Sequence, residues 1–442
     1  MNKKAMSKKS SKKPLISKKN YMPRIADSTI AEYLKTFGGV EVAGTKWCGK
    51  TWSSIAHAKS YVFVEDEADL AGADPSIILQ GDAPRVIDEW QCVPKIWDAA
   101  RRQIDINAGT PGQFILTGSA TPAQDAENAP LHSGAGRFGR VRMFPMSLFE
   151  SGESTGDVSL ASLFSHEFSP CVASNDTQEL LEYACRGGWP AVVSGKVANF
   201  SLMLEQYIDY TCLRSFPKLQ LDSDTALRLL RSLARNVSQS ATYKTLLADM
   251  YGADTSEKFL SQKTLSRYLS VLKQMFVIEE IPGWTPASRS KARLQTKPKR
   301  YFADQSIACA ALGLSTKKLL SDWQTFGMLF EDMVMRDLMV YSQLLTHFGD
   351  HPLMYYHDDS GLECDAIIEL SDGRWAGIEI KVSEDKVETA CKNLLRLKKK
   401  LCENPKAQNS PPEFLAVIVG IGKYARKTED GIYVIPIRAL GP

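Results

Sequence analysis

Long apolar runs are missing from this sequence. A helix that spans a bilayer needs about 18–20 consecutive apolar residues, and the best apolar stretch, 415–422, is far shorter and is typical of a buried strand. The nine cysteines form no CxxC pair, and the six histidines never cluster at the spacing of zinc ligands. The lysine-rich start has no apolar core of a secretory signal. These absences predict a soluble cytoplasmic protein with no membrane partner and no zinc site.

The composition is that of an ordinary globular protein. Of 442 residues, 44% are hydrophobic and 24% are charged, which excludes bulk disorder. A chain of this length is expected to form about three domains. Residues 1–20 carry eight lysines, and no acid precedes Asp27. We predict a flexible basic tail over 1–20, with weak attraction to nucleic acid as the alternative.

Three segments differ in their patterns, and together they predict an α/β protein. Short apolar runs alternate with helical segments from Val40 to Phe144, which favours a parallel sheet with helices on both faces, in a P-loop NTPase domain over 21–174. Leucines then recur at helical spacing, and two strands flank a basic run, which predicts a helical and winged-helix domain over 175–304. A last segment over 305–442 has a helix from about Phe326 and four further strands.

A phosphate-binding loop stands between the first strand and the first helix of this alternating region. In the pattern GxxxxGK[ST], glycines let backbone N–H groups close around phosphates, and the helix N-terminus adds partial positive charge. Lys50 is expected to bridge the β- and γ-phosphates of ATP, and Thr51 to ligate Mg²⁺. The loop consists of Gly44, Thr45, Lys46, Trp47, Cys48, Gly49, Lys50 and Thr51.

A pair of acids follows 37 residues after Thr51, at the end of a short strand. We expect Asp88 to hold Mg²⁺ through water and Glu89 to orient or deprotonate the attacking water. The next apolar strand ends in hydroxyls, so Thr117 or Ser119 is a candidate γ-phosphate sensor, although a plain strand-terminal turn explains them almost equally well. Arg137, Arg140 and Arg142 follow in a glycine-bearing loop, and surface arginines are the favoured interpretation. The alternative is that one of them, with Arg137 as the candidate, is an arginine finger in cis or for a neighbouring subunit.

These blocks resemble a prokaryotic family of AAA-type P-loop ATPases that carry a C-terminal domain of unknown function. The resemblance rests on 44–51, on the sequence Ile-Asp-Glu-Trp-Gln at 87–91, on 116–119 and on the segment from Gly136 to Glu150. It implies nucleotide binding and hydrolysis, and it supplies no substrate.

The middle segment predicts helices near 226–237, 243–250 and 263–276, followed by two strands around a basic run. A winged helix has this order, and its third helix would present Lys263 and Arg267 to a DNA groove. The wing would contact phosphates. A protein-interaction module is the alternative. The basic residues of the wing are Arg289, Lys291, Arg293, Lys297, Lys299 and Arg300.

The C-terminal segment places acids and a lysine on neighbouring strands. Strand alternation puts Glu379 and Lys381 on one face, Asp365 lies on the preceding strand, and Glu331 lies on the helix before it. Carboxylates beside a lysine suit Mg²⁺-dependent phosphodiester hydrolysis. The pattern resembles the PD-(D/E)xK nuclease superfamily, with Cys364 where its proline usually stands. This resemblance implies a restriction-endonuclease-like domain with metal ligands Glu331, Asp365 and Glu379 and catalytic Lys381.

Two functions follow from this sequence. The first is an ATP-hydrolysing protein that acts on DNA through a metal-dependent nuclease domain. The second is an ATP-driven switch that binds a protein partner, or a second copy of itself, with a catalytically silent nuclease-like domain.

Overall fold

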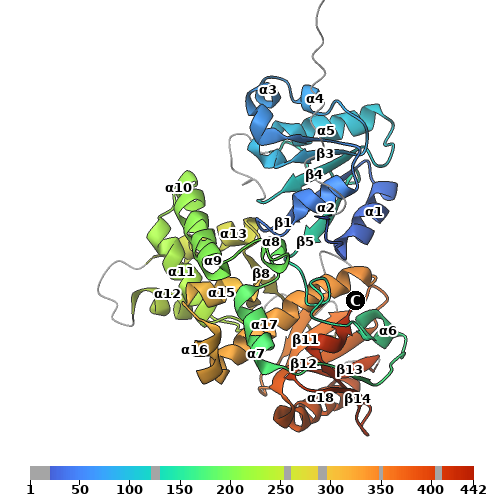
Figure 1. Cartoon of the computed structure of the whole chain (residues 1–442), viewed down its shortest axis with the longest axis vertical. Helices are drawn as coiled ribbons and strands as arrows, with labels where there is room; N and C mark the ends of the chain where they lie inside the picture. The colour runs from blue at the N-terminus through green and yellow to red at the C-terminus, as the bar shows by residue number, and fades with distance from the viewer. Residues whose placement is uncertain (1–19, 121–129, 253–259, 287–295, 348–351, 404–410) are drawn as a thin grey trace, which may run out of the picture.

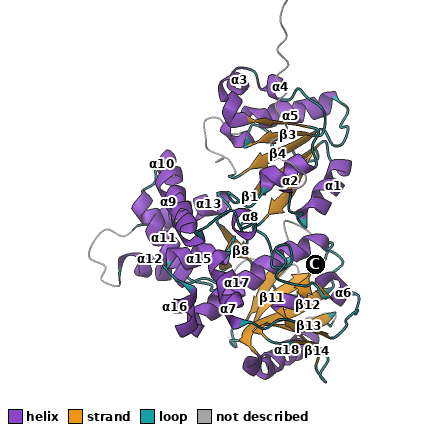
Figure 2. Ribbon diagram, viewed as in Figure 1, coloured by secondary structure: helices purple, strands orange, loops and turns teal. Residues whose placement is uncertain are grey.

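The computed structural model describes residues 20–120, 130–252, 260–286, 296–347, 352–403 and 411–442. The chain forms three bodies (Figure 1): a blue-cyan α/β body, a largely helical body coloured green to yellow, and an orange-red α/β body. Strands concentrate in the first and third bodies (Figure 2). The basic tail predicted over 1–20 lies outside the described residues apart from Asn20.

The first body is built on a five-stranded parallel sheet in the order β2-β3-β4-β1-β5. Val40, Val86 and Ile115 are fully buried between the sheet and its helices, which explains why such short apolar runs form strands here. This sheet confirms the predicted α/β architecture. Its strands are β1 (Gly39–Gly44), β2 (Ser60–Phe63), β3 (Arg85–Asp88), β4 (Phe114–Gly118) and β5 (Phe138–Met143). Its helices are α1 (Ala26–Thr36), α2 (Lys50–Ala56), α3 (Ala68–Ala73), α4 (Pro75–Ile78) and α5 (Lys95–Ile106).

The middle body is helical, with one antiparallel hairpin of β8 (Ile278–Ile281) and β9 (Lys299–Phe302). The three helices α11, α12 and α13 precede this hairpin in the predicted order, while the winged-helix assignment itself stays a prediction. Each of these three helices begins after a side-chain N-cap, namely Asp222, Thr242 and Ser261. The helices are α7 (Thr177–Arg186), α8 (Pro190–Val193), α9 (Phe200–Tyr210), α10 (Phe216–Lys218), α11 (Ser223–Arg235), α12 (Tyr243–Tyr251), α13 (Gln262–Gln274), α15 (Gln305–Ala311) and α16 (Thr316–Ser321).

The third body has a seven-stranded mixed sheet in the order β10-β11-β12-β13-β15-β14-β7. The long helix α17 packs on β12, and α18 packs on β11, β12 and β13. Its helices are α17 (Trp323–Tyr341) and α18 (Val387–Cys402). Its strands are β10 (Leu353–His357), β11 (Glu363–Glu369), β12 (Trp375–Ser383), β13 (Phe414–Ile421), β14 (Tyr424–Lys427) and β15 (Tyr433–Pro436).

The segment after β5 leaves the first body and joins the third. Strand β6 (Val158–Ser159) pairs with β16 (Leu440–Gly441), and β7 (Cys171–Val172) pairs with β14. Helix α6 (Leu160–Phe164) lies between β6 and β7 in the chain. The predicted first domain runs to residue 174, whereas these strands belong to the third body because their backbone groups complete its sheets. In the same way α15, at the start of the predicted third domain, packs on α7, α9 and α11 of the middle body.

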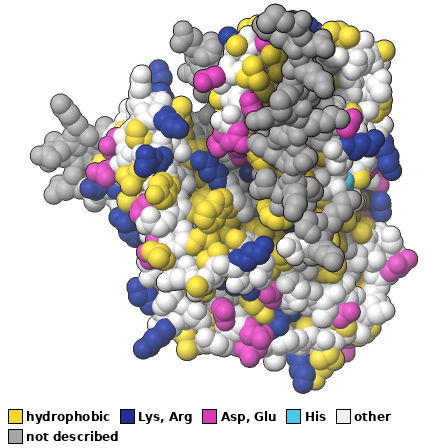
Figure 3. Space-filling view, turned by 45° about the horizontal axis from the view of Figure 1, so that its top comes forward, with side chains coloured by type: hydrophobic (Ala, Val, Ile, Leu, Met, Phe, Trp, Pro, Cys, Tyr) yellow, Lys and Arg dark blue, Asp and Glu magenta, His cyan; other side chains and the backbone are white. Residues whose placement is uncertain are grey.

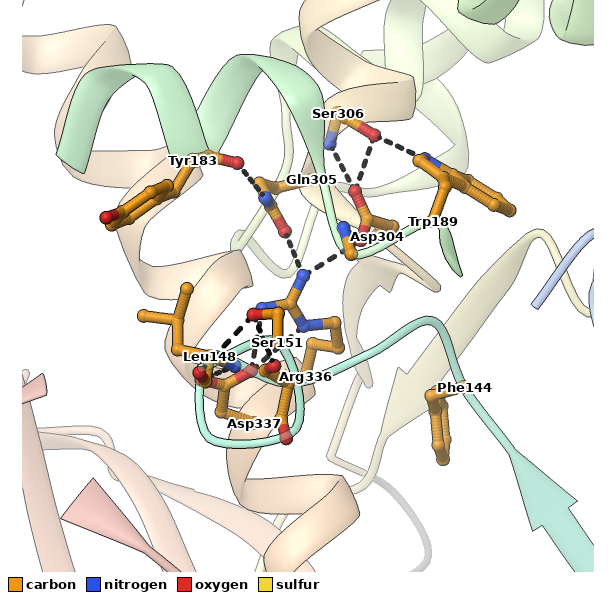
Figure 4. Close-up of polar contacts among 12 residues, drawn as sticks. Phe144, Leu148, Ser151, Tyr183, Trp189, Asp304, Gln305, Ser306, Arg336 and Asp337 are labelled. Carbon is orange, nitrogen blue, oxygen red and sulfur yellow. Dashed lines mark hydrogen bonds and ion pairs between the residues drawn. The ribbon is translucent and has the colours of Figure 1, made fainter. Parts of the chain in front are cut away.

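A buried polar network joins the bodies around Arg336 (Figure 4). The guanidinium donates to Asp304 Oδ2 at 2.8 Å and to Asp337 Oδ1 at 2.7 Å, and all three side chains are almost fully buried. Asp337 accepts from the backbone N–H of Leu148 at 3.2 Å, and Asp304 accepts from that of Gly188 at 2.8 Å. One arginine therefore ties the linker after β5 to the middle body and to α17.

Among the residues that the structure describes, none of the helices combines the length and apolarity that crossing a membrane requires.

Candidate functional site

The predicted phosphate loop leaves the C-terminal end of β1 and turns into α2. Trp47 and Gly49 have φ angles of 68° and 105°, so the loop coils in the left-handed region before Lys50 begins the helix. A Cβ on Gly44 would lie 2.3 Å from the carbonyl oxygen of Met143, so only glycine fits there. The Lys50 side chain is buried, and its Nζ donates to the carbonyl oxygen of Thr45 at 2.9 Å. The Lys50 ammonium group is therefore bound to the backbone of the phosphate loop itself.

The first predicted acid lies against this loop. Asp88 Oδ1 accepts from the Thr51 hydroxyl at 2.8 Å and from the Thr117 hydroxyl at 2.5 Å. Burial raises the pKa of Asp88, although the two hydroxyl hydrogen bonds oppose this. Three predicted site residues from β3, α2 and β4 therefore meet at one carboxylate.

The second predicted acid, Glu89, is held by other polar groups at the C-terminal ends of the strands. Glu89 has a φ of 56°, and its N–H donates to Thr117 Oγ1 at 3.1 Å. Its Oε2 accepts from the Ser119 hydroxyl at 2.7 Å and from the amide of Gln91. Gln91 was not among the predicted site residues, although it lies in the block that carries the family resemblance. The carboxylate is therefore oriented by side chains from two segments.

A cavity of about 1110 Å³ opens in front of these groups, between the first and middle bodies. Lys46, Trp47, Asp88, Glu89 and Ser119 line one side. The middle body lines the other side with residues from α8, from the turn after α9, from α10 and from the end of α13, which are Pro190, Ala191, Ser215, Lys218, Val271, Gln274 and Met275. The site is therefore a cleft between two bodies.

Two supports of the loop had no signal in the sequence. Tyr207 on α9 shares a 2.5 Å hydrogen bond with the hydroxyl of Thr45. Arg24 donates to the carbonyl oxygen of Cys48 at 2.7 Å and pairs with Glu150 at 3.0 Å. Cys48 itself is buried, with its Sγ directed at the Met143 carbonyl oxygen at 3.6 Å. These partners are 24 to 162 residues away in the chain, so spacing could not reveal them.

Arg137 does not reach this cleft. It precedes β5, and because β5 runs parallel to β1 it lies at the sheet edge opposite the phosphate loop, where it pairs with Asp105 at 2.9 Å. Arg142, at the other end of β5, lies beside the loop instead. Its guanidinium donates to the carbonyl oxygens of Ala43 and Met143 at 3.5 and 3.4 Å, and it pairs with Glu279. A finger role in cis for Arg137 does not fit this placement, and a role toward a neighbouring subunit stays a prediction.

A second group of polar residues lies on the sheet of the third body. Lys381 Nζ contacts Glu379 Oε2 at 2.6 Å and Asp365 Oδ2 at 3.0 Å. Asp365 Oδ2 also accepts from the backbone N–H of Ile380 at 2.8 Å. Cys364 is buried, with its Sγ directed at the carbonyl oxygens of its own and the next strand. The structure therefore brings three of the four predicted residues together.

Glu331 extends this group but has other partners. Its Oε1 accepts from Lys299 Nζ at 3.2 Å and from the Tyr301 hydroxyl at 2.8 Å, and Lys299 also pairs with Glu363 at 2.6 Å. Within the described ranges, no group of three or more Asp, Glu, His or Cys side chains is arranged to hold a metal ion. Two lysine ammonium groups stand among these carboxylates instead. We call Glu331, Glu363, Asp365, Glu379 and Lys381 the acid cluster.

Burial and mutual repulsion shift the titration of the acid cluster. Burial, and then the charge of Asp365, raise the pKa of Glu379 to about 7, although Lys381 opposes this. Burial also raises the pKa of Glu331 to about 7, against the opposing charge of Lys299. Burial alone would lower the pKa of Lys299, but Glu331, Asp365 and Glu363 outweigh it and raise the pKa above its ordinary value. The lysine stays charged, as its position among acids requires.

The basic run predicted as a DNA-contacting wing is partly buried. Lys299 and Arg300 are 5% and 7% exposed, and Arg300 pairs with Glu280 at 3.0 Å. The side chains of Lys299 and Arg300 are therefore unavailable for phosphate contact, because each is paired with acids of its own chain. Lys297 lies just before β9, and Arg289, Lys291 and Arg293 lie outside the described residues.

The helix predicted to read DNA does expose its basic residues. Lys263 and Arg267 are on the outer face of α13, and Arg267 donates to the carbonyl oxygen of Leu219 at 3.0 Å. On the face shown in Figure 3, the basic side chains that are coloured are interspersed with acidic ones and form no single basic patch.

Comparisons with known proteins agree with the first site. Residues 39–151 match the family model of an AAA domain. The chain therefore carries an AAA-type P-loop ATPase domain, which supports ATP binding. Residues 177–318 and 326–440 match two families described as domains of unknown function, DUF8612 and DUF4143.

Proteins that resemble longer stretches of the chain add no further activity. An uncharacterized protein of Haemophilus influenzae is 22% identical over 327 residues, which cover 68% of this chain and 74% of that protein. A Walker-type ATPase of Pyrococcus abyssi is 12% identical, with a TM-score of 0.43 over 66% of this chain and 97% of that one. A DNA replication initiation factor is 11% identical, with a TM-score of 0.26 over 57% of this chain and 92% of that one. These two TM-scores are too low to bear on function.

Proposed function

We propose that the chain binds ATP in the cleft between the first and middle bodies and hydrolyses it there. Residues 44–51 would enclose the phosphates, and Lys50 would turn from the Thr45 carbonyl to the β- and γ-phosphates. The Thr51 hydroxyl and Asp88 are suited to hold Mg²⁺, which when bound would neutralise charge on these phosphates. Thr117 and Ser119 would sense the γ-phosphate, because their hydroxyls are hydrogen-bonded to Asp88 and Glu89 beside it.

The observation that carries this proposal is the shared hydrogen bonding of the two acids. Thr51 and Thr117 donate to the same Asp88 oxygen, and Ser119 and Gln91 donate to the same Glu89 oxygen. This arrangement leaves Glu89 beside the cleft as an oriented base for a water molecule. It combines a metal ligand and a base at the carboxyl end of a parallel sheet, where phosphoryl chemistry requires both.

A smaller cavity of about 210 Å³ adjoins Gly49 and suits the base of the nucleotide. Tyr21 and Trp52 bring aromatic rings to it, and Pro190 of the middle body lies on its wall. Aromatic and apolar walls favour a flat heterocycle. We propose that the base sits there, with the phosphates running past Gly49 toward Asp88.

ATP turnover by the full chain tests this function. We expect Lys50→Ala to abolish binding of a fluorescent ATP analogue and hydrolysis together. Glu89→Gln should bind ATP but turn it over roughly 10²–10⁴-fold more slowly, since that is the usual contribution of a positioned general base. Glu32→Gln, at an exposed site on α1, is the matched control and should leave both unchanged.

Wild-type protein that binds no ATP in Mg²⁺ would overturn the proposal. Tight binding without turnover would remove hydrolysis and leave the ATP-driven switch, for which a protein partner would then be sought.

We propose a second activity, metal-dependent cleavage of DNA, at the acid cluster. Asp365, Glu379 and Lys381 converge on adjacent strands, as a metal site with a neighbouring lysine requires. Asp365 and Glu379 are the carboxylates suited to Mg²⁺, while Glu331 would join them only when Lys299 moves away. Lys263 and Arg267 on α13 are the exposed side chains that we propose contact DNA.

Plasmid cleavage in Mg²⁺ or Mn²⁺, without nucleotide and with ATP, tests the second activity. Glu379→Gln should lose cleavage, and Glu388→Gln, which breaks an exposed ion pair on α18, should keep it. An intact plasmid under every condition would favour the silent domain of the switch and leave the ATPase proposal standing.

A further inference from the structure

The β8–β9 hairpin contacts both candidate sites. Glu279 on β8 pairs with Arg142, beside the phosphate loop. Tyr301, directly across from Glu279 on β9, and Lys299, two residues earlier, contact Glu331 of the acid cluster. Glu279 pairs with Tyr301 in the strand register, and Lys299 is two residues from Tyr301, so these three side chains share one face of the hairpin. We infer that this hairpin couples the nucleotide site to the acid cluster, with Lys299 as the tethered cation that keeps the cluster closed.

The contact between the hairpin and the nucleotide site, which Arg142 and Glu279 make, is tightly packed. The Arg142 guanidinium is 4.2 Å from the ring centroid of Phe276 and 4.7 Å from that of Phe144. Its donations to the carbonyl oxygens of Ala43 and Met143 tie the end of β1, from which the phosphate loop starts, to the neighbouring end of β5. Because Glu279 is its carboxylate partner, the position of the hairpin sets the position of Arg142.

On the side of the acid cluster, the hairpin contact is made by the buried Lys299. The Lys299 side chain is 6% exposed, and it bridges Glu331 at 3.2 Å and Glu363 at 2.6 Å. The chain after β8 is held to β10 by the backbone N–H of Trp284, which donates to the Tyr355 carbonyl oxygen at 2.6 Å. A divalent cation that used Glu331 together with Asp365 and Glu379 would have to displace the Lys299 ammonium group from Glu331, because both bind this carboxylate.

The sign of the coupling follows from these contacts. An anchored hairpin holds Arg142, and Arg142 contacts the end of β1, which leads into the phosphate loop, so the anchor favours nucleotide binding. By thermodynamic reciprocity, bound nucleotide strengthens the hold of Lys299 and Tyr301 on the cluster. ATP therefore keeps Glu331 paired with Lys299, and its loss frees Glu331 to join Asp365 and Glu379 around a cation. This inference rests on the proposed ATP site.

A double-mutant cycle on the full chain measures the coupling. Lys299→Met should weaken binding of a fluorescent ATP analogue about threefold or more, although Lys299 lies on the acid cluster. The same change in a Glu279→Gln background should have little further effect, because the link is already broken. Tyr301→Phe, which removes only a hydroxyl group, should reproduce the weakening in smaller measure. Lys273→Met, which breaks the 2.6 Å pair to Glu280 on the opposite face of the hairpin, is the matched control.

Hydrogen exchange supplies a readout that a merely structural role would not change. The β9 amides should exchange more slowly when wild-type protein binds ATP, and this protection should disappear in Glu279→Gln. Additive effects of Lys299→Met and Glu279→Gln, or β9 exchange that ATP leaves unchanged, would overturn the coupling even where ATP binds normally. Wild-type protein that fails to bind ATP would instead refute the proposed function.

Discussion

Asp88 shows how a residue can be anticipated from the sequence while its surroundings cannot. Its place after a short strand, 37 residues beyond Thr51, follows from the order of elements in a P-loop sheet. Thr51 and Thr117 were also named as site residues, but their hydrogen bonds to Asp88 were not predicted. Tyr207 and Arg24 were missed, since they arrive from distant elements through tertiary packing. Arg137 was named as the finger candidate because the sequence does not reveal which end of β5 faces the phosphate loop, and it is Arg142 that lies there.

Glu280 gives a prediction at the residue scale. Burial alone would raise its pKa, but Lys273 and Arg300 outweigh burial and hold the pKa below its ordinary value. A carboxyl group with a depressed folded-state pKa contributes stability that is present above its unfolded pKa and lost as the pH falls. We therefore expect the difference in Tm between wild type and Glu280→Gln to shrink as the pH is lowered from about 5 to 3. Thermal unfolding followed by circular dichroism at each pH measures it, and a difference independent of pH would contradict the assignment.

At the scale of elements, the predictable parts were those with a strong local pattern. The strands of the first sheet and β10 to β13 are apolar runs, and the structure has strands at each of these places. The strands β6, β7 and β16 have two residues each, too few to show any alternation, and they form only because partners far along the chain complete them. The basic run was interpreted as a solvated wing because the acid partners of Lys299, Glu331 and Glu363, lie more than 30 residues away. Charge that is unpaired locally can still be paired by the fold.

At the scale of the whole molecule, the Arg336 network determines whether the three bodies unfold together. Arg336→Met would leave Asp304 and Asp337 buried without their cation, and breaking a buried pair in this way costs about 3–5 kcal/mol. We expect a loss of this size in the free energy of unfolding in urea. The network also joins the bodies, so we expect the first body to unfold apart from the other two, giving a second transition.

Arg235→Met is the matched control for this prediction. Arg235 pairs with Asp249 at 3.6 Å on the surface of the middle body, and its side chain is 64% exposed. Exposed pairs contribute about 0–1 kcal/mol, so this variant should unfold nearly as wild type does. Equal losses in the two variants would show that the Arg336 network does not hold the bodies together.

The pairing of β6 with β16 and of β7 with β14 has a consequence for synthesis on the ribosome. The first sheet is complete once residue 143 has emerged, because its five strands are consecutive in the chain. Residues 171–172 must instead wait for residues 424–425, about 250 residues later, which at 5–20 residues per second is roughly 13–50 s. During that interval the backbone groups of β6 and β7 have no native partner, and the nascent chain presents them beside an already folded ATPase domain. The first body, which carries the phosphate loop, can therefore fold early in synthesis, whereas the sheet that carries the acid cluster can be completed only when translation is almost finished.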